Sequence, residues 1–401
     1  MRRLLIVSSC AHYEFEGQLW SYGPYAREIE LWADLFETVR IACPVRREKP
    51  PGDCTPLARR NISALPVTEA GGDTWKAKLG LALAAPLMSA TIVRGMLWAD
   101  GVHVRCPGNL GLLGALLAPL VTRRMVAKYA GSWMRMPGDD PGTMIQRALL
   151  RRWFRGPVTV YGEWPGEPAN IVPFFTSLVS EEQMDRARRA AGARKPSKTV
   201  RILYTGRLSQ AKNIDVTLEA AAAARAQGAA VEVTIIGDGP EREALEALAR
   251  KLGIAEWTTF TGGVGFETVM EHLERANTLV LASETEGWPK SAAEAMAFGV
   301  LCIGSNRGYF GRMLEGRGIA IEPRDKAALT GAIADLAANP ENYEGLRRNA
   351  AAWAQQFSME GLREAIRKLL EQRWRVRLRG GDEKQDRVDV TAGMPAGREA
   401  K

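Results

Sequence analysis

The segment Glu286-Gly-Trp-Pro-Lys-Ser-Ala-Ala-Glu294 holds residue types that can bind a sugar and a diphosphate. Its two carboxylates, Glu286 and Glu294, can accept hydrogen bonds from neighbouring hydroxyls of a ribose or a hexose. Gly287 lets the backbone approach a ligand closely, and Pro289 suits the start of a helix whose first amides would face an anion. The same spacing also fits a solvated helix start with a Lys290–Glu294 surface ion pair. Spacing alone leaves both interpretations open.

A second segment, Gly206-Arg-Leu-Ser-Gln-Ala-Lys-Asn213, places two cations between a predicted strand and a predicted helix. Arg207 and Lys212 could clamp a diphosphate beside the helix N-terminus. Fixed positive charges at that place would stabilise a leaving nucleoside diphosphate without a metal ion. The alternative for this segment, considered by itself, is a pair of exposed loop cations.

A third segment, Gly237-Asp-Gly-Pro240, holds the first two glycines of a G-x-G-x-x-G dinucleotide fingerprint. The third glycine is missing, and Ala244 is the nearest small residue, so the segment gives weak support for a nicotinamide site. It does fit a tight turn in any nucleotide-binding sheet, and Gly239 therefore joins the candidate binding residues.

Each of these segments follows a short apolar run that predicts a buried strand, and helical patterns separate the runs. The predicted strands of this half end near Gly206, Gly237, Thr261, Ala282 and Gly304. Strict alternation of strand and helix predicts a parallel sheet covered by helices, a doubly wound domain. Such sheets bind ligands outside the carboxyl ends of their strands, where the three segments lie.

The first half shows the same alternation less clearly. Its expected strands are Leu4–Ser8, Thr38–Ala42, Gly101–Arg105, Met125–Tyr129 and, as the last, Thr159–Tyr161. We expect residues 1–175 to form an acceptor-binding doubly wound domain and residues 176–375 to form the donor-binding domain, including a terminal helix. The two α/β domains would face each other across a cleft that holds the donor site. Residues 376–401, with adjacent glycines and scattered charges, are expected to be disordered.

Bulk properties fit a soluble globular protein with an anionic ligand or surface. The chain has 401 residues, 46% of them hydrophobic, and a formal net charge of +8. Five scattered cysteines and three distant histidines show no metal-ligand spacing, so we expect reduced thiols, a cytoplasmic protein and no metal site. Two apolar stretches, Leu79–Val93 and Leu110–Thr122, each contain a proline and are shorter than the roughly 20 residues that span a bilayer. We therefore expect no transmembrane helix.

Four motifs in a fixed order resemble a known family. The order G-R-L-S-x-x-K-N, I-I-G-D-G-P-E, F-x-G-x-V and S-E-T-E-G-W-P-K-x-x-x-E-A-M-A-F-G, across Val200–Ser305, resembles the retaining glycosyltransferases of family 4 with the type B fold. The phrase Glu-Gly-Trp-Pro-Lys is similar to bacterial surface-polysaccharide members. The resemblance implies two facing Rossmann-like domains, a UDP- or GDP-sugar as co-substrate, a lipid-linked or growing polysaccharide acceptor, and no cofactor or metal.

The resemblance also implies roles for single residues. Arg207 and Lys212 would bind the donor diphosphate and act in catalysis with Glu286, which would contact hydroxyls of the donor sugar. Glu294 would hold the ribose hydroxyls, and Val264 would lie beside the base. Further donor contacts are implied for the turns and the helix start: Gly206, Gly239, Gly287, Trp288, Pro289, Lys290 and Ser291.

The N-terminal half departs from the family pattern. Where many relatives carry a histidine that meets the sugar, this chain has Ala130, which argues against a histidine-assisted mechanism. His103 lies at a strand end, either as an acceptor contact or as a hydrogen-bonded core residue. The acceptor-side candidates are Gly17 or Gly23, as substitutes for the Gly-Gly loop of relatives, together with His103, Arg105 and Trp133.

Residues 123–155 hold eight basic side chains and two acidic ones, with aromatic residues among them: Arg123, Arg124, Lys128, Arg135, Arg147, Arg151, Arg152, Arg155, Asp139, Asp140, Trp133, Trp153 and Phe154. This composition favours peripheral docking to the anionic inner face of a membrane, near a lipid-linked acceptor. A solvated helix face over core aromatics is the alternative. No nucleic-acid motif accompanies the charge, so we expect no nucleic-acid partner.

Two other functions compete with sugar transfer. A catalytically silent scaffold subunit fits the altered N-terminal loops, but the intact Arg207, Lys212, Glu286 and Glu294 argue against it. A nicotinamide oxidoreductase is disfavoured by the incomplete glycine fingerprint.

Overall fold

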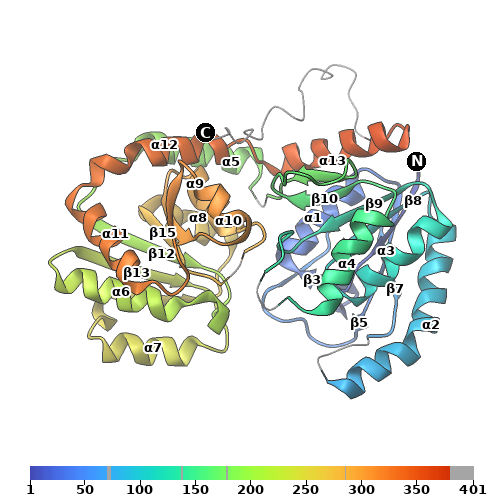
Figure 1. Ribbon diagram of the computed structural model, residues 1–401, viewed down its shortest axis with the longest axis horizontal. Helices are drawn as coiled ribbons and strands as arrows, with labels where there is room; N and C mark the ends of the chain where they lie inside the picture. The colour runs from blue at the N-terminus through green and yellow to red at the C-terminus, as the bar shows by residue number, and fades with distance from the viewer. Residues whose placement is uncertain (70–73, 137–138, 178, 285, 380–401) are drawn as a thin grey trace. The chain divides into compact units, whose positions relative to one another are not determined.

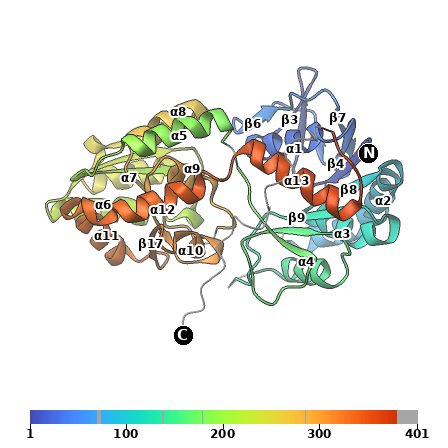
Figure 2. The same ribbon diagram turned by 90° about the horizontal axis from the view of Figure 1, so that it is seen from above.

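The computed structural model describes residues 1–69, 74–136, 139–177, 179–284 and 286–379, which form two compact units. The first unit comprises Met1–Thr176 and the described residues from Glu360 onward, and the second comprises Ser177–Met359. Each unit contains a parallel sheet with helices on both faces (Figures 1 and 2). The expectation of two Rossmann-like domains is confirmed for the units taken separately.

The six-stranded sheet of the second unit has the order β14-β13-β12-β15-β16-β17, with every neighbouring pair parallel. The chain moves outward from β12 to β14 and then restarts at β15, on the other side of β12. The carboxyl ends of β12 and β15 therefore flank the topological switch point of a doubly wound sheet. The strands are β12 (Thr199–Thr205), β13 (Ala230–Ile236), β14 (Thr258–Gly262), β15 (Thr278–Leu281), β16 (Leu301–Ser305) and β17 (Gly318–Ile321).

Helices on both faces bury these strands, which explains their nearly continuous apolar sequences. All residues of β15 and β16, for example, are buried. The helices of this unit are α5 (Glu181–Ala193), α6 (Ile214–Ala226), α7 (Arg242–Lys251), α8 (Phe266–Arg275), α9 (Lys290–Ala297), α10 (Gly308–Leu314), α11 (Lys326–Ala338) and α12 (Glu344–Ala354), with short 3₁₀ turns η1 (Gln210–Lys212), η2 (Ala255–Trp257) and η3 (Pro340–Tyr343).

The seven-stranded sheet of the first unit has the order β11-β10-β9-β8-β1-β4-β7 and is also parallel throughout. Its switch point lies between β1 and β8. The strands are β1 (Arg3–Val7), β4 (Thr38–Cys43), β7 (Ile62–Pro66), β8 (Gly101–Cys106), β9 (Met125–Tyr129), β10 (Val158–Tyr161) and β11 (Ile171–Phe174), and the helices are α1 (Gly23–Asp34), α2 (Trp75–Trp98), α3 (Asn109–Val121), α4 (Pro141–Arg152) and α13 (Met359–Trp374).

Several elements of this unit were not expected. β11 follows the strand at Thr159–Tyr161, which is therefore not the last; Pro173 within β11 is tolerated because β11 is an edge strand. A second, small sheet has the strand order β5-β2-β3-β6. Its strands are β2 (His12–Phe15), β3 (Gln18–Tyr22), β5 (Val45–Arg46) and β6 (Cys54–Pro56).

The terminal helix α13 corrects the expected domain assignment. We placed it in the donor-binding domain, but it belongs to the first unit. Its buried side chains recur every four residues, at Leu362, Ile366, Leu370 and Trp374, and form one apolar face. The Trp374 ring lies against Gly101, where a larger side chain would leave no space, and its indole N–H donates to the Met125 carbonyl at 3.2 Å.

The structure describes residues 376–379, the first four residues of the tail that we expected to be disordered. Leu378 is buried, and its N–H donates to the Glu371 carboxylate at 2.8 Å. Residues 380–401, to which the rest of that expectation applies, lie outside the described residues.

Candidate functional site

Two loops at the switch point of the second unit are tied together by Asn213. The loop after β12 holds Arg207 and Lys212, and the loop after β15 leads to Glu286. Asn213 adopts a left-handed conformation (φ +50°) and is buried. Its side-chain amide donates to the Ala282 carbonyl at 2.8 Å and to the Glu284 carboxylate at 2.9 Å. The two loops that carry the predicted cations and carboxylate therefore form one structural piece.

Lys212 and Glu286 meet directly in this piece. The Lys212 Nζ lies 2.5 Å from Glu286 Oε1, although 74 positions separate the residues in the chain. Their side chains are 27% and 15% exposed, so a ligand can still reach the pair. Arg207, on the same loop as Lys212, is exposed. Two of the three predicted catalytic side chains thus form an ion pair at the switch point, with the third on an adjacent turn.

A buried tyrosine fixes the turn that carries Arg207. Tyr204, at the end of β12, is 1% exposed, and its hydroxyl donates to the Arg207 carbonyl at 2.9 Å. Burial, together with the nearby Glu286 carboxylate, raises the pKa of this hydroxyl, so Tyr204 stays neutral and keeps its proton for this hydrogen bond.

Three turns at the same sheet edge pack backbone against backbone. Gly237 (φ +134°) lies so close to the Gly206 carbonyl that a Cβ atom would come within 1.9 Å of its oxygen. Gly239 (φ +159°) lies equally close to Leu208, with 2.2 Å to the carbonyl oxygen. Gly237 N–H also donates to Gly262 at 2.9 Å, next to the half-buried Val264. The glycines of the incomplete fingerprint therefore allow close packing of turns, and the helix expected from Pro240 begins at Arg242 instead.

Helix α9 presents its N-terminus after the Glu286 loop. It begins at Lys290, directly after Pro289, and no side chain caps it among the described residues. The first backbone amides of an uncapped helix can donate to an anion. Glu294, in its second turn, is only 7% exposed. This burial argues against the solvated surface pair that spacing alone allowed, and places Glu294 in a low-dielectric setting.

Trp288 holds the Glu286 loop in place from inside. Its ring stacks on Tyr309 and Trp353, with centroids 5.6 Å and 5.7 Å away, and meets the edge of Phe357 at 5.4 Å. Trp288 and Pro289 are both buried. The predicted donor contact of Trp288 can therefore come from its backbone, whereas its side chain positions the half-buried Gly287 and Lys290 on either side.

A residue that was not among the candidates braces the loop after β12, which holds Arg207 and Lys212. Arg324, after β17, donates to the Asn213 side-chain oxygen at 2.8 Å and to the Asp215 carboxylate at 2.9 Å. It lies more than 100 positions from both partners, so no local pattern points to it. The sequence does point to Asn213, because an asparagine directly before a helix often caps that helix. Here, however, Asn213 makes no capping bond to α6.

On the acceptor side, Arg105 joins a buried ionic cluster in the first unit. Its guanidinium lies 2.6 Å from one oxygen of Glu28, and Lys128 Nζ lies 2.7 Å from the other. The Thr176 hydroxyl also donates to Glu28, at 3.3 Å. Arg105 and Lys128 are the second-last residues of the neighbouring strands β8 and β9, so the cluster lies near the carboxyl edge of the sheet. Two cations share one carboxylate there. Neither Glu28 nor Lys128 was among the acceptor-side candidates.

His103 and Trp133 are core residues. His103 is completely buried and stacks on Trp32 with ring centroids 3.9 Å apart. Burial lowers the pKa of its imidazole well below the usual range, and neither ring nitrogen has a hydrogen-bond partner among the described residues. Trp133 is 1% exposed and packs on Tyr129 and under the Arg151 guanidinium. Neither side chain reaches solvent, which contradicts an acceptor contact of Trp133 or His103. The alternative for His103, a core residue, is confirmed by its burial but without the hydrogen bond that we expected.

The two candidate glycines serve local turns. Gly17 (φ +72°) lies in the turn between β2 and β3, with open space around it. Gly23 begins α1 and donates its N–H to Asp53 at 2.9 Å. The left-handed conformation at Gly17 explains the need for glycine there. That one of them takes the place of the Gly-Gly loop of relatives stays a prediction.

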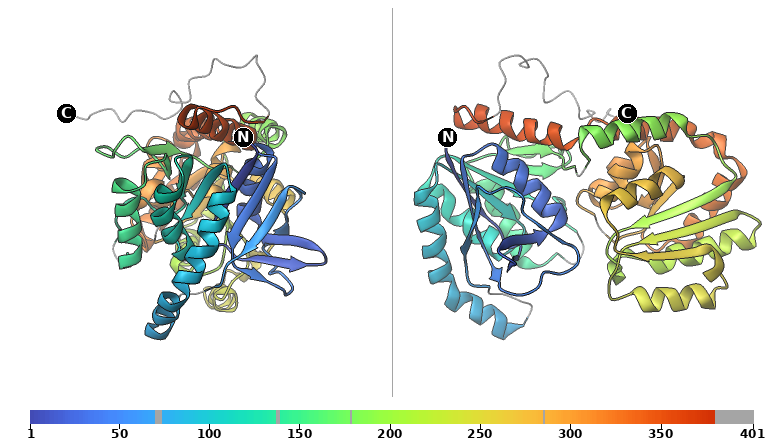
Figure 3. Two further views of the ribbon diagram at one scale, coloured as in Figure 1. Left: turned by 90° about the vertical axis from the view of Figure 1, so that its right-hand side faces the viewer. Right: turned by 180° about the vertical axis from the view of Figure 1, so that it is seen from behind.

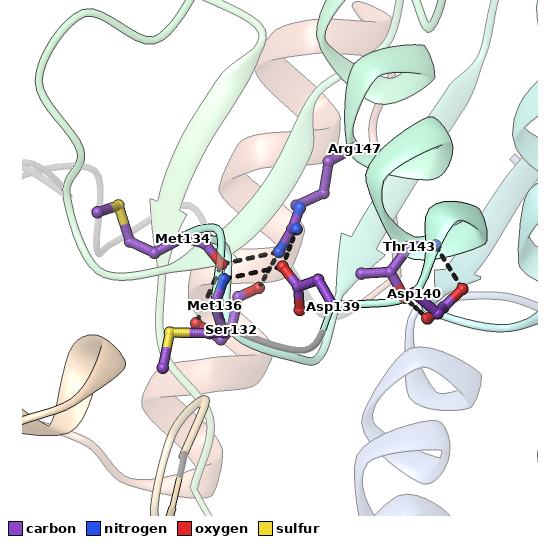
Figure 4. Close-up of polar contacts among 7 residues, drawn as sticks. All are labelled: Ser132, Met134, Met136, Asp139, Asp140, Thr143 and Arg147. Atoms are coloured by element: carbon purple, nitrogen blue, oxygen red, sulfur yellow. Dashed lines mark hydrogen bonds and ion pairs between the residues drawn. The ribbon is translucent and has the colours of Figure 1, made fainter.

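Part of the basic segment 123–155 shapes the loop after β9. Arg147, on α4, pairs with Asp139 and donates to the carbonyls of Ser132 and Met134, and Asp140 caps α4 by accepting from the Thr143 N–H at 3.0 Å (Figure 4). These contacts bury Arg147. Lys128 and Arg151 are also paired with acids, whereas the others are exposed: Arg123, Arg124, Arg135, Arg152 and Arg155.

Within the described ranges, no three His, Cys, Asp or Glu side chains lie together in a way that could hold a metal ion.

Comparison with known proteins agrees with this geometry. Residues 185–353 match the family model described as glycosyl transferases group 1. A glycogen synthase of Mycobacterium tuberculosis is 28% identical over 210 residues, which cover 52% of this chain and 50% of that protein. A D-inositol 3-phosphate glycosyltransferase of Acidothermus cellulolyticus is 26% identical over 354 residues, or 80% of this chain and 78% of that protein. The chain thus spans about half the length of the first of these relatives.

Solved structures resemble the fold across most of the chain. A sucrose-phosphate synthase from Thermosynechococcus elongatus has a TM-score of 0.69 at 18% identity and covers 94% of this chain and 100% of its own. Anabaena HepE in complex with UDP has a TM-score of 0.64 at 16% identity, with 93% and 100% covered. At these identities the likeness shows the fold, which is that of the type B glycosyltransferases.

Proposed function

We propose that the chain transfers a sugar from a nucleoside-diphosphate donor to a hydroxyl acceptor, which the match of residues 185–353 to the glycosyl transferases group 1 family supports. The reaction would retain the anomeric configuration and need no metal ion. The observation that carries the proposal is the Lys212–Glu286 pair at the β12–β15 switch point, beside exposed Arg207 and the uncapped start of α9.

The donor diphosphate would bind among positive groups. Arg207, Lys212 and the first amides of α9 are the donors that match its oxygens. As Lys212 turns from Glu286 to the phosphate, the Glu286 carboxylate becomes available to hydroxyls of the donor sugar. Glu294, buried in the second turn of α9, would accept from the ribose hydroxyls. Binding would thus exchange one ion pair for two sets of ligand contacts.

In the transfer step, the bond between the anomeric carbon and the diphosphate oxygen breaks and a bond to the acceptor oxygen forms on the same face. The acceptor proton passes to the departing phosphate oxygen, and negative charge grows on that diphosphate. Arg207 and Lys212 would stabilise this charge from fixed positions, which lowers the barrier without a metal ion.

Two further parts of the proposal concern the substrates. UDP and GDP are the candidate donor nucleotides: HepE was solved with UDP, and a relative from Mycolicibacterium smegmatis is named as a GDP-mannose-dependent alpha-(1-6)-phosphatidylinositol monomannoside mannosyltransferase. That relative is 28% identical over 270 residues, which cover 61% of this chain and 69% of its own. The lipid in the name of that relative supports a lipid-linked acceptor for this chain, and we propose that the transfer takes place in the cytoplasm.

A thermal-unfolding panel tests the donor side. The full chain is heated in EDTA with UDP, GDP, ADP, UDP-glucose or GDP-mannose. We expect one base to raise the Tm by several degrees, because a ligand at about 100 times its Kd stabilises the folded state by about 2.7 kcal/mol. No shift with any nucleotide would support the scaffold alternative. A shift that appears only when magnesium replaces EDTA would contradict metal independence.

A further inference from the structure

Helix α2 is longer and more exposed than its sequence suggested. We expected the apolar stretch to stop near Val93, but α2 runs without a break from Trp75 to Trp98, through Pro86. Its last 20 residues, Leu79–Trp98, have a mean hydropathy of 1.5, and only 22% of the most apolar window is buried. By length and composition alone, this helix could cross a bilayer, which corrects the expectation that no helix of the chain could do so.

One face of α2 packs on the sheet of the first unit. Met88, Ile92 and Met96 recur at four-residue spacing and are at most 1% exposed. Gly95 lies against the side chains of Leu5 and Leu65, where a Cβ atom would come within 3.0 Å of both. The C-terminal half of α2 is therefore fixed to the sheet along its length and cannot leave it to span a membrane.

The opposite face of α2 is apolar and exposed. Trp75, Leu79, Leu83, Leu87 and Leu97 are 70%, 54%, 75%, 67% and 72% exposed. At about 100° per residue, these five side chains fall within an arc of roughly 120°. A helix that is apolar all round is normally buried, so the exposed stripe indicates a surface that something covers.

Helix α3 extends this surface. It packs beside α2, as Figures 1 and 3 also show, and exposes Leu116 and Leu120 at 43% and 67%. Trp153, at the end of α4, donates its indole N–H to the Leu116 carbonyl at 2.9 Å and is itself 37% exposed. We refer to the exposed residues of α2 and α3, together with Trp153, as the α2–α3 face.

The segment that forms the α2–α3 face is rich in cations. Between residues 74 and 136 the sequence holds eight lysines and arginines and a single acid, Asp100, and two of the eight, Arg105 and Lys128, pair with Glu28 away from this face. Asp100 is paired with Arg3 at 3.1 Å. Arg94 on α2 and Arg123 and Arg124 after α3 are exposed. An apolar stripe bordered by cations complements an anionic lipid surface, in which the stripe enters the acyl region and the cations meet the headgroups.

We propose that the α2–α3 face binds an anionic bilayer, with α2 lying in the plane of one leaflet. The inference deepens the proposed function, because it places the first unit where a lipid-linked acceptor would be found. It keeps Arg123, Arg124 and Trp153 of the segment 123–155 at the membrane, whereas Lys128, Arg147 and Arg151 of that segment are engaged within the unit.

Vesicle co-sedimentation of the full chain tests this proposal. Vesicles of phosphatidylcholine and phosphatidylglycerol in equal parts are compared with vesicles of phosphatidylcholine alone. We expect strong binding to the first and at least about tenfold weaker binding to the second, because several cations meet the headgroups. Leu83→Gln/Leu87→Gln should weaken binding to the anionic vesicles by about tenfold or more, since two exposed leucines leave the acyl region. Arg123→Gln/Arg124→Gln should remove much of the preference for the anionic lipid.

The matched control, Ala247→Gln/Ala352→Gln, alters exposed residues of helices α7 and α12 in the second unit and should bind vesicles like the unaltered chain. Equal binding of the Leu83→Gln/Leu87→Gln variant would overturn the proposal, as would a chain that binds no vesicles. A dimer in solution that the leucine variant converts to monomers would assign the face to a second copy instead. The nucleotide-induced Tm shift of each variant separates these outcomes from a failure of the proposed function.

Discussion

Lys212→Ala should lower kcat/KM for sugar transfer by about 100- to 1,000-fold, the range seen when one fixed donor to a developing charge is removed. The structure places Lys212 Nζ 2.5 Å from Glu286, at the switch point and beside Arg207. Removing the cation takes a positive charge from the leaving diphosphate and leaves the Glu286 carboxylate to repel it. Release of the nucleoside diphosphate, measured with the donor that the thermal panel identifies, gives the rate.

Two controls separate this effect from general loss of charge. Lys326→Ala removes a comparable cation, which pairs with Glu219 on neighbouring helices, and should leave kcat/KM unchanged. Glu286→Gln frees Lys212 from its partner, so the affinity for the nucleoside diphosphate alone should hold or rise while turnover falls. A Lys212→Ala enzyme with full activity would rule out the assigned role of this pair.

Glu294→Gln should weaken binding of the nucleoside diphosphate by about 10- to 100-fold, because hydrogen bonds to a charged group contribute about 1.5–3 kcal/mol. Glu294 is 7% exposed, so water replaces a lost ribose contact poorly. The substitution keeps the side-chain shape and removes the charge. Isothermal titration of the unaltered chain and the variant measures the difference.

The 2′-deoxynucleotide provides the specific control for this residue. The unaltered chain should bind it more weakly than the ribonucleotide, and Glu294→Gln should bind the two almost equally. Glu243→Gln, an exposed position on helix α7, should behave like the unaltered chain. A Glu294→Gln variant that still prefers the ribonucleotide to the same degree would show that another group reads the ribose.

The grouping of the candidate donor residues could be predicted because they lie in motifs at strand ends. Arg207, Lys212 and Glu286 lie in the loops that follow buried strands, and Glu294 lies in the helix after the second loop; a parallel sheet collects such positions at one edge. What the sequence could not reveal is which of them touch. The contact between Lys212 and Glu286, and the bracing of Asn213 by Arg324, join positions 74 and 111 apart.

The contacts of the acceptor-side candidates were harder to predict, because their partners are also distant in the sequence. Arg105 was recognised at a strand end, but its partner Glu28 comes from α1 and is 77 positions away. His103, two residues before Arg105, points to the same face of the strand and is buried against Trp32, which lies one turn after Glu28 in α1. Local sequence placed both residues near the edge of the sheet, but it did not show which residue of α1 each of them meets.

Helices α2 and α13 show the limits of apolar patterns. The buried face of α13 was visible in the sequence, but not the sheet it packs on, because that depends on the space that Gly101 leaves for Trp374. In α2, the apolar stretch that we recognised ends at Val93, whereas the helix continues to Trp98. An apolar sequence also does not tell which of its faces the fold buries, and in α2 the face with Leu83 and Leu87 stays exposed.

The most direct test of the central claim is a crystal structure of the full chain with the nucleoside diphosphate that stabilises it most. The account predicts the diphosphate at the β12–β15 switch point, in contact with Arg207, Lys212 and the first amides of α9. It also predicts the ribose hydroxyls on Glu294 and a Lys212 that has turned away from Glu286. A nucleotide bound at any other edge of the sheet, or one that leaves the Lys212–Glu286 pair and Glu294 untouched, would contradict it.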